Sequence, residues 1–260
     1  QPNVVPSSAS VWYFIREVTA DGILQNFATL QQIAEGAALM SDTSVTRRIV
    51  GAAYPRHFNR PIALAMDQNI QNVGLPQWSE DDQQFAKALQ TLMGSEDPQG
   101  LATELSGITP DLEEPVSGGS DDIGDVAWNV PTVTLRYPSN VSGLQGHHWS
   151  SAMAMATPIA HKGAVAGAKV IATTMLDLVQ SDTLVNEAHS YFDDVQTADE
   201  EYQPFIGPED PPAIEKNEDI MAEFRPLLQD LYYDPSRYDT YLEQLGIDYP
   251  QLEATEIRRN

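Results

Sequence analysis

Hydrophobic positions recur with two different periods along this chain. Over residues 23–37 apolar side chains stand three and four positions apart, which predicts an amphipathic helix capped at Asp21. The same spacing predicts helices over 61–73, 79–93 and 158–179. Segments rich in β-branched and aromatic residues predict strands over 10–16, 43–50 and 128–137. A strand, a helix and a strand within the first fifty residues indicate a compact α/β unit.

The helix predicted over 158–179 combines a broad apolar face with small Gly and Ala residues, so it can approach a neighbour closely. We expect the strand that precedes it to be that neighbour. Between Gly94 and Gly119 the chain is polar, rich in Pro and Gly and without periodicity, which predicts a long surface loop.

The character of the chain changes after residue 180. Residues 181–260 hold 20 acidic and 5 basic residues, yet apolar spacing still predicts helices over 184–195, 220–231 and 238–245. We therefore predict an acidic helical tail.

Composition removes several functional classes. The 260 residues include 14 Lys and Arg against 38 Asp and Glu, a formal net charge of −24, so binding to nucleic acid or to an anionic membrane surface is not expected. The absence of cysteine excludes disulfides, a thiol nucleophile and a Cys-ligated zinc site. No apolar run is long enough to cross a membrane.

The beginning of the chain carries two further expectations. It opens at Gln1 without a basic stretch and apolar run, so no signal peptide is visible and we expect a cytoplasmic protein, with a periplasmic or secreted one left open. The first residues already have the character of folded sequence. We expect the chain to be a piece of something longer, or a processed product.

Three short clusters contain the residue types that carry chemistry. Residues 118–125 place three carboxylates in a glycine-rich turn, 146–149 read GHHW, and 160–163 read AHKG. Taken alone, each has an ordinary structural interpretation: a solvated turn, surface histidines and a helix start.

Taken in order, the clusters resemble a known family. The runs GGSDDIGDVAWNVPTVTL, GHHW and IAHKGAVAGAKVIA, together with PNVVPSSASVWYFIR and IAEGAALMSDTSV, are similar to the C-terminal half of the zinc metallopeptidase and amidohydrolase family. That family includes glutamate carboxypeptidases and aminoacylases, and the resemblance is to its aminobenzoyl-glutamate utilization protein B branch. It spans residues 2–180.

This resemblance implies an α/β fold in parts. Residues 1–55 would be the second part of an α/β lid, or dimerisation, domain, and 56–210 the C-terminal part of a mixed-sheet α/β metallopeptidase domain. Residues 211–260 would be the acidic helical C-terminal extension. The general-base Glu and most ligands of two divalent metal ions, zinc or manganese, would lie in an N-terminal half that this chain lacks.

The resemblance also assigns individual residues. His147 matches the last metal-ligand histidine, fourteen positions before His161, although the adjacent His148 leaves an ambiguity of one residue. Asn3 and Arg16 fall where related carboxypeptidases hold the carboxylate end of the substrate, and Asp122 matches an acid of the turn beside the substrate pocket. An Arg fork on a strand suits a carboxylate; an ordinary exposed strand residue is the alternative.

The function implied is metal-assisted hydrolysis of the amide bond of an N-acyl amino acid, of the p-aminobenzoyl-glutamate type. An aminoacylase or dipeptidase of the same family is one alternative. A non-catalytic lid and scaffold fragment, or a regulatory subunit, is another. The partners implied are the small-molecule substrate and a second subunit, in a homodimer or heterodimer formed through the lid. Because one good metal histidine is too few for a dinuclear site, we expect no activity from this chain by itself.

Overall fold

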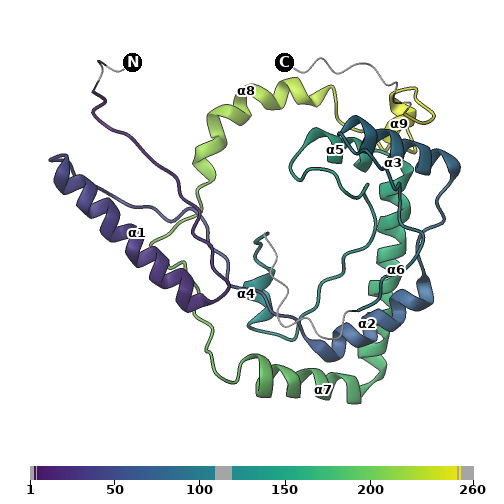
Figure 1. Cartoon of the computed structure of the whole chain (residues 1–260), viewed down its shortest axis with the longest axis horizontal. Coiled ribbons are helices and arrows are strands. Elements are labelled where there is room, and N and C mark those ends of the chain that lie inside the picture. The colour runs from purple at the N-terminus through teal and green to yellow at the C-terminus, as the bar shows by residue number, and fades with distance from the viewer. Residues whose placement is uncertain (1–2, 4, 109–118, 251, 253–260) are drawn as a thin grey trace. The chain divides into compact units, whose positions relative to one another are not determined.

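The structure is a computed structural model that describes residues 3, 5–108, 119–250 and 252. The described residues fold into helices joined by turns and extended segments (Figure 1). They divide into two compact units. The first contains the described parts of 1–57, 113–130 and 200–213, and the second those of 58–112, 131–199 and 214–260.

The first unit contains two helices. Helix α1 (Ala20–Met40) begins after Thr19, whose hydroxyl oxygen accepts a hydrogen bond from the backbone N–H of Gly22 at 3.1 Å. The predicted helix is confirmed, but its cap is Thr19 rather than Asp21, which instead places its charge in the first turn. Helix α4 (Ile123–Ala127) is short and follows the acidic turn.

The second unit is built around two long helices. Helix α2 (Arg60–Val73) packs against α6 (Pro158–Gln180), and Asn69 of α2 donates hydrogen bonds to Thr174 at 3.2 Å and to Asp177 at 2.6 Å. The buried Asn59 caps α2 and donates to the carbonyl oxygen of Ala188 at 2.8 Å. These amide contacts join α2 to α6 and to the helix that follows α6.

The remaining elements of the second unit are shorter, and several confirm the predicted helices. They are α3 (Glu80–Leu92), α5 (Trp149–Met155), α7 (Asp182–Tyr191), the π-helical turn η1 (Phe192–Gln196), the 3-10 turn η2 (Ile214–Asn217), α8 (Glu218–Gln229) and α9 (Tyr241–Gln244). A core cluster forms where α3, α5 and α6 meet, with Phe85, Leu89, Leu101, Val141 and Ile159 buried together.

The predicted α/β fold class is wrong. In the residues that the structure describes there is no β-strand, so neither the α/β lid nor the mixed-sheet α/β domain is present as a sheet. The segments 10–16, 43–50 and 131–137 are extended, but extended backbone becomes a strand only when a neighbouring strand accepts and donates its backbone hydrogen bonds. Their β-branched and aromatic composition predicted the conformation and not the pairing.

The predicted neighbour of α6 is confirmed as a segment, though not as a strand. A Cβ added at Gly163 would lie 2.0 Å from the carbonyl oxygen of Pro138, and one at Gly167 would lie 3.3 Å from Tyr137. The small residues of α6 therefore let the extended segment 131–139 run against the helix.

Residues 109–118 of the predicted surface loop lie outside the described residues, and 95–108 contain neither helix nor strand. Among the helices described, none is both long and apolar enough to span a membrane.

Candidate functional site

The acidic turn before α4 is held by contacts within the first unit. The guanidinium of Arg56 pairs with Asp121 at 3.1 Å, and the other oxygen of Asp121 accepts the backbone N–H of Ile123 at 3.2 Å. Asp121 therefore fixes the turn from both sides.

Asp125 anchors the same turn to the aromatic core of the first unit. One carboxylate oxygen accepts the backbone N–H of Tyr54 at 3.1 Å, and the other accepts the hydroxyl of Tyr202 at 2.8 Å. A Cβ on Gly124 would meet the carbonyl oxygen of Tyr54 at 1.9 Å, so the turn and the chain at Tyr54 approach as closely as glycine allows. Asp125 acts as a structural acceptor.

Tyr54 is the centre of that aromatic core. Its ring stacks on Phe205 with centroids 4.7 Å apart and meets Trp128 and Tyr202 edge-on. Its hydroxyl donates to Glu200 at 2.8 Å. Burial, and then the hydrogen bond and negative charge of Glu200, raise the pKa of Tyr54 to about 12.

Asp122 differs from its two acidic neighbours. It is exposed, and its side chain makes no capping hydrogen bond to α4, although it occupies the N-cap position. Of the three carboxylates in the turn, Asp122 is thus the most exposed. Its role beside a substrate pocket stays a prediction.

The two other candidates for substrate binding also belong to the first unit. Asn3 and Arg16 are both exposed, and the Arg16 guanidinium lies 5.4 Å from the centroid of the Phe14 ring. Asn3 and Arg16 come from one stretch of the first unit, and Asp122 comes from another.

His147 and His148 have different environments in the second unit. His148 is the N-cap of α5: its Nδ1 accepts the backbone N–H of Ser150 at 3.3 Å and lies 2.9 Å from the Ser150 hydroxyl. His147 is exposed and has a φ of 55°, an uncommon value for a residue other than glycine. His148 therefore has a local structural task, which leaves His147 as the better candidate ligand of the two.

The donors present here do not fit a complete metal site. Among the described residues, no group of three or more His, Asp or Glu side chains is arranged to hold a metal ion. His147 could supply one ligand, and a structural or catalytic site needs at least three protein ligands for zinc.

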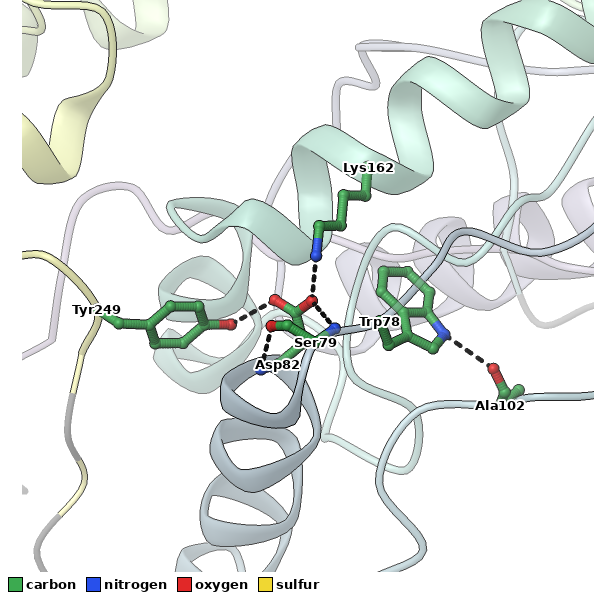
Figure 2. Close-up of polar contacts among 6 residues, drawn as sticks. All are labelled: Trp78, Ser79, Asp82, Ala102, Lys162 and Tyr249. Carbon is green, nitrogen blue, oxygen red and sulfur yellow. Dashed lines mark hydrogen bonds and ion pairs between the residues drawn. The ribbon is translucent and has the colours of Figure 1, made fainter.

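A polar cluster surrounds Asp82 at the start of α3, as Figure 2 shows, and sequence reasoning missed it. Asp82 is fully buried. One of its oxygens accepts hydrogen bonds from the Ser79 backbone N–H at 2.8 Å and from Lys162 at 2.5 Å, and the other accepts the Tyr249 hydroxyl at 2.8 Å. The pattern Ser79-x-x-Asp82 is a recognisable capping box, but nothing local indicates its distant partners.

Electrostatics explains how the Asp82 cluster keeps a buried charge. Burial alone would raise the pKa of Asp82, but the hydrogen bonds from Lys162, Ser79 and Tyr249 outweigh it and lower that pKa below its ordinary value. Burial and the same carboxylate raise the pKa of Tyr249 well above its ordinary value. At neutral pH the cluster therefore holds Asp82 as a carboxylate and Tyr249 as a neutral phenol.

The cavity beside this cluster is small. It measures about 180 Å³ and is lined by α3 and by Tyr249, Pro250 and Leu252. Binding pockets for small molecules commonly measure about 300–1,000 Å³. The Asp82 cluster therefore connects the C-terminal extension to α3 and α6 and is not a substrate pocket. Lys162 of the AHKG motif is occupied in this structural contact.

Comparison with known proteins gives a relative. The chain is 30% identical over 210 residues to the B subunit of p-aminobenzoyl-glutamate hydrolase from Escherichia coli (strain K12). It is similar to a hydrolase subunit. The match covers 72% of this chain and 43% of the relative, so the chain spans less than half the length of the protein it matches.

Two other comparisons found nothing. No family model matches the sequence, and no solved structure matches the chain. The similarity to the hydrolase subunit supports part of the resemblance in the clusters, and membership of a zinc metallopeptidase family stays a prediction.

Proposed function

We propose that this chain is part of a hydrolase that cleaves the amide bond of an N-acyl amino acid such as p-aminobenzoyl-glutamate. The observation that carries the proposal is the 30% identity over 210 residues to a subunit of p-aminobenzoyl-glutamate hydrolase. Because this match covers 72% of the chain, it extends well beyond any single motif.

Within this proposal, Arg16 recognises the carboxylate end of the substrate. Its guanidinium is planar, permanently charged and exposed, and it can form two parallel hydrogen bonds to a carboxylate. Asn3 would add an amide donor, and Asp122 would contribute an exposed acid beside the pocket.

The proposal also includes two divalent metal ions, zinc or manganese. His147 is the ligand that this chain would supply. The other ligands and the general-base Glu would come from outside the described residues, because those residues do not assemble a metal site themselves. The expectation that the chain is inactive by itself belongs to the same proposal.

We further propose that the chain works with a second polypeptide. The relative is, by its name, one subunit of its hydrolase, and this chain would likewise assemble with another chain, in a homodimer or a heterodimer. A cytoplasmic location is the setting we propose for it.

The test uses the chain in its natural assembly. An affinity-tagged chain is purified from its own cells, and glutamate release from p-aminobenzoyl-glutamate is measured before and after chelation of divalent metals. We expect the assembly to release glutamate, to lose this activity on chelation and to regain it when zinc or manganese is added. An assembly that releases no glutamate contradicts the proposal.

Two arginine variants test the role of Arg16. Loss of a charge-assisted contact of about 1.5–3 kcal/mol predicts that Arg16→Ala lowers kcat/KM roughly 10- to 100-fold. Arg47→Ala is the matched control, since Arg47 is also exposed and lies 5.4 Å from the centroid of the Phe27 ring in the same unit. Equal effects of the two substitutions would argue against carboxylate binding by Arg16.

A non-catalytic subunit is the second candidate. It is favoured by the absence, among the residues described, of a group of three acids or histidines able to bind a metal. On this alternative the assembly is active, while Arg16→Ala, Asp122→Asn and His147→Ala all leave kcat and KM unchanged.

A further inference from the structure

Helix α8 in the acidic extension is amphipathic. At about 3.6 residues per turn, Ile220, Phe224, Leu227 and Leu228 fall on one face of the helix. Leu231 continues the same face one residue beyond the C-cap, Asp230. Five large apolar side chains therefore form a continuous stripe, which we call the α8 stripe.

The α8 stripe is exposed in the part of the chain that the structure describes. Ile220 is 54% exposed, Leu227 65% and Leu231 61%, and all residues from 222 to 230 are exposed. A surface helix of a folded domain normally buries such a stripe, because removing apolar surface from water is the main driving force for its packing. A contiguous exposed stripe is characteristic of an interaction site.

Charge is distributed unequally along the two borders of the stripe. Asp219, Glu223 and Asp230 fall at intervals of four and seven residues, which places them in a row along one border. The opposite border carries Arg225 and Glu218. One border is therefore uniformly acidic and the other is mixed.

We propose that the α8 stripe docks into an apolar groove of a partner protein whose rim carries Lys or Arg along one side. The helix supplies the spacing of apolar anchors that helix-in-groove recognition uses. The acidic row selects a basic rim and sets the orientation of the helix, because like charges across the interface are unfavourable.

A second copy of this chain is a poorer occupant. In an antiparallel pair of α8 helices the equivalent borders meet, so the acidic row of one copy would face that of the other. Each copy also carries a formal net charge of −24. Both features oppose self-association and favour a basic partner.

The test measures binding of two helical peptides to the full chain by fluorescence anisotropy. Each probe has a leucine face, bordered by Lys in one peptide and by Glu in the other. We expect the Lys-bordered peptide to bind at least about tenfold more tightly and to weaken as salt is raised.

Three double variants locate the binding. Phe224→Ser with Leu227→Ser should weaken the Lys-bordered peptide at least about tenfold. Glu223→Lys with Asp230→Lys should reverse the preference toward the Glu-bordered peptide. Glu96→Lys with Asp97→Lys makes the same change of net charge at exposed positions elsewhere in the second unit and should leave the preference as it is. Circular dichroism checks that helix content is preserved.

Four results would overturn the proposal. The first is binding of neither peptide, and the second is binding that survives Phe224→Ser with Leu227→Ser. The third is an equal response to the charge changes at 96 and 97 and at 223 and 230, which would show general attraction of a cationic peptide to an acidic protein. The fourth is a dimer of the chain in sedimentation that the serine variant dissociates, because the occupant would then be a second copy.

Discussion

At the scale of single residues, the clearest physical result is the way a buried charge is compensated. Asp82 is fully buried, and both of its oxygens accept hydrogen bonds. A buried carboxylate that loses one hydrogen-bond donor still carries the cost of its desolvation. Removal of a partner of Asp82 should therefore lower the free energy of unfolding by more than the net contribution of one hydrogen bond. Lys162 is the only charged partner in the contacts described for it.

Replacement of Lys162 by Met should destabilise the second unit. The change leaves the charge of Asp82 buried with only neutral donors, and we expect a loss of about 1–3 kcal/mol in the free energy of unfolding. Urea unfolding followed by circular dichroism measures it. Lys169→Met is the matched control, because Lys169 is an exposed lysine of the same helix. Adding Asp82→Asn to Lys162→Met should recover part of the lost free energy of unfolding, because the unpaired buried charge is then removed. If the destabilising effects of the two single substitutions simply add in the double variant, Lys162 does not compensate the charge of Asp82.

The raised pKa of Tyr54 predicts how the stability of the first unit changes at alkaline pH. Its pKa is raised to about 12, so the folded chain holds the phenol proton more tightly than the unfolded chain, whose tyrosines ionise near pH 10. The stabilisation is therefore complete below about pH 10 and is lost as the pH rises toward 12. We expect Tyr54→Phe to remove this part of the alkaline decline in the free energy of unfolding.

Urea unfolding at several pH values between 8 and 12 tests the role of Tyr54. Tyr13→Phe is the control, because Tyr13 is a largely exposed tyrosine of the same unit. An alkaline decline that is identical in Tyr54→Phe and in the unmodified chain would rule out the assignment.

At the scale of elements, helix formation follows local sequence, whereas the packing of the helices depends on individual small residues. Helix α1 and helix α6 each contain glycine in their interior, which local propensity disfavours in both. The surroundings differ. Gly163 of α6 lies against the backbone of Pro138 and Ser139, while a Cβ at Gly36 of α1 would meet nothing within 4 Å.

The same substitution should therefore have opposite effects in the two helices. Gly36→Ala should stabilise by up to about 1 kcal/mol, since alanine loses less backbone entropy in a helix. Gly163→Ala should destabilise by about 1–3 kcal/mol, because its methyl group cannot fit against a backbone carbonyl oxygen 2.0 Å away. Thermal and urea unfolding of both variants measure the signs. Stabilisation by Gly163→Ala would show that the contact with Pro138 is not maintained in solution.

At the scale of the whole molecule, net charge is the dominant property. With a formal charge of −24 and four lysines, the folded chain concentrates negative charge that the unfolded chain spreads out. Asp82 and Asp121 are paired with a cation, but the 38 Asp and Glu far outnumber the 14 Lys and Arg. Most of the repulsion is therefore open to screening by salt.

Salt should stabilise the protein. The Debye length falls from about 30 Å at 0.01 M to about 10 Å at 0.1 M, so raising sodium chloride across this range should increase the free energy of unfolding. Urea titrations at each salt concentration test this, with sodium sulfate excluded because it also strengthens apolar burial. A salt-independent midpoint would mean that the acidic surface does not limit stability.

The sequence alone predicted the longer helices of this protein, because periodic apolar spacing and caps act within a few residues, but it did not predict the short helices α4 and α5. The capping box of Ser79 and Asp82 and the apolar spacing of α6 can be recognised in the sequence in this way. The sequence also contains the motifs that resemble a known family, and the 30% identity to a hydrolase subunit supports part of that resemblance. Asn3, Arg16, Asp122 and His147 stay predictions, since their roles depend on groups outside the described residues.

The tertiary structure decided what lies far apart along the chain. Composition suggested strands over 10–16, 43–50 and 128–137, but strand pairing needs a partner that composition does not specify. Lys162 and Tyr249 meet Asp82 across 80 and 167 positions of sequence, and no local pattern encodes such a contact. Local geometry is set by neighbours within a turn or two, whereas burial, ion pairing and pKa depend on which distant groups the fold brings together.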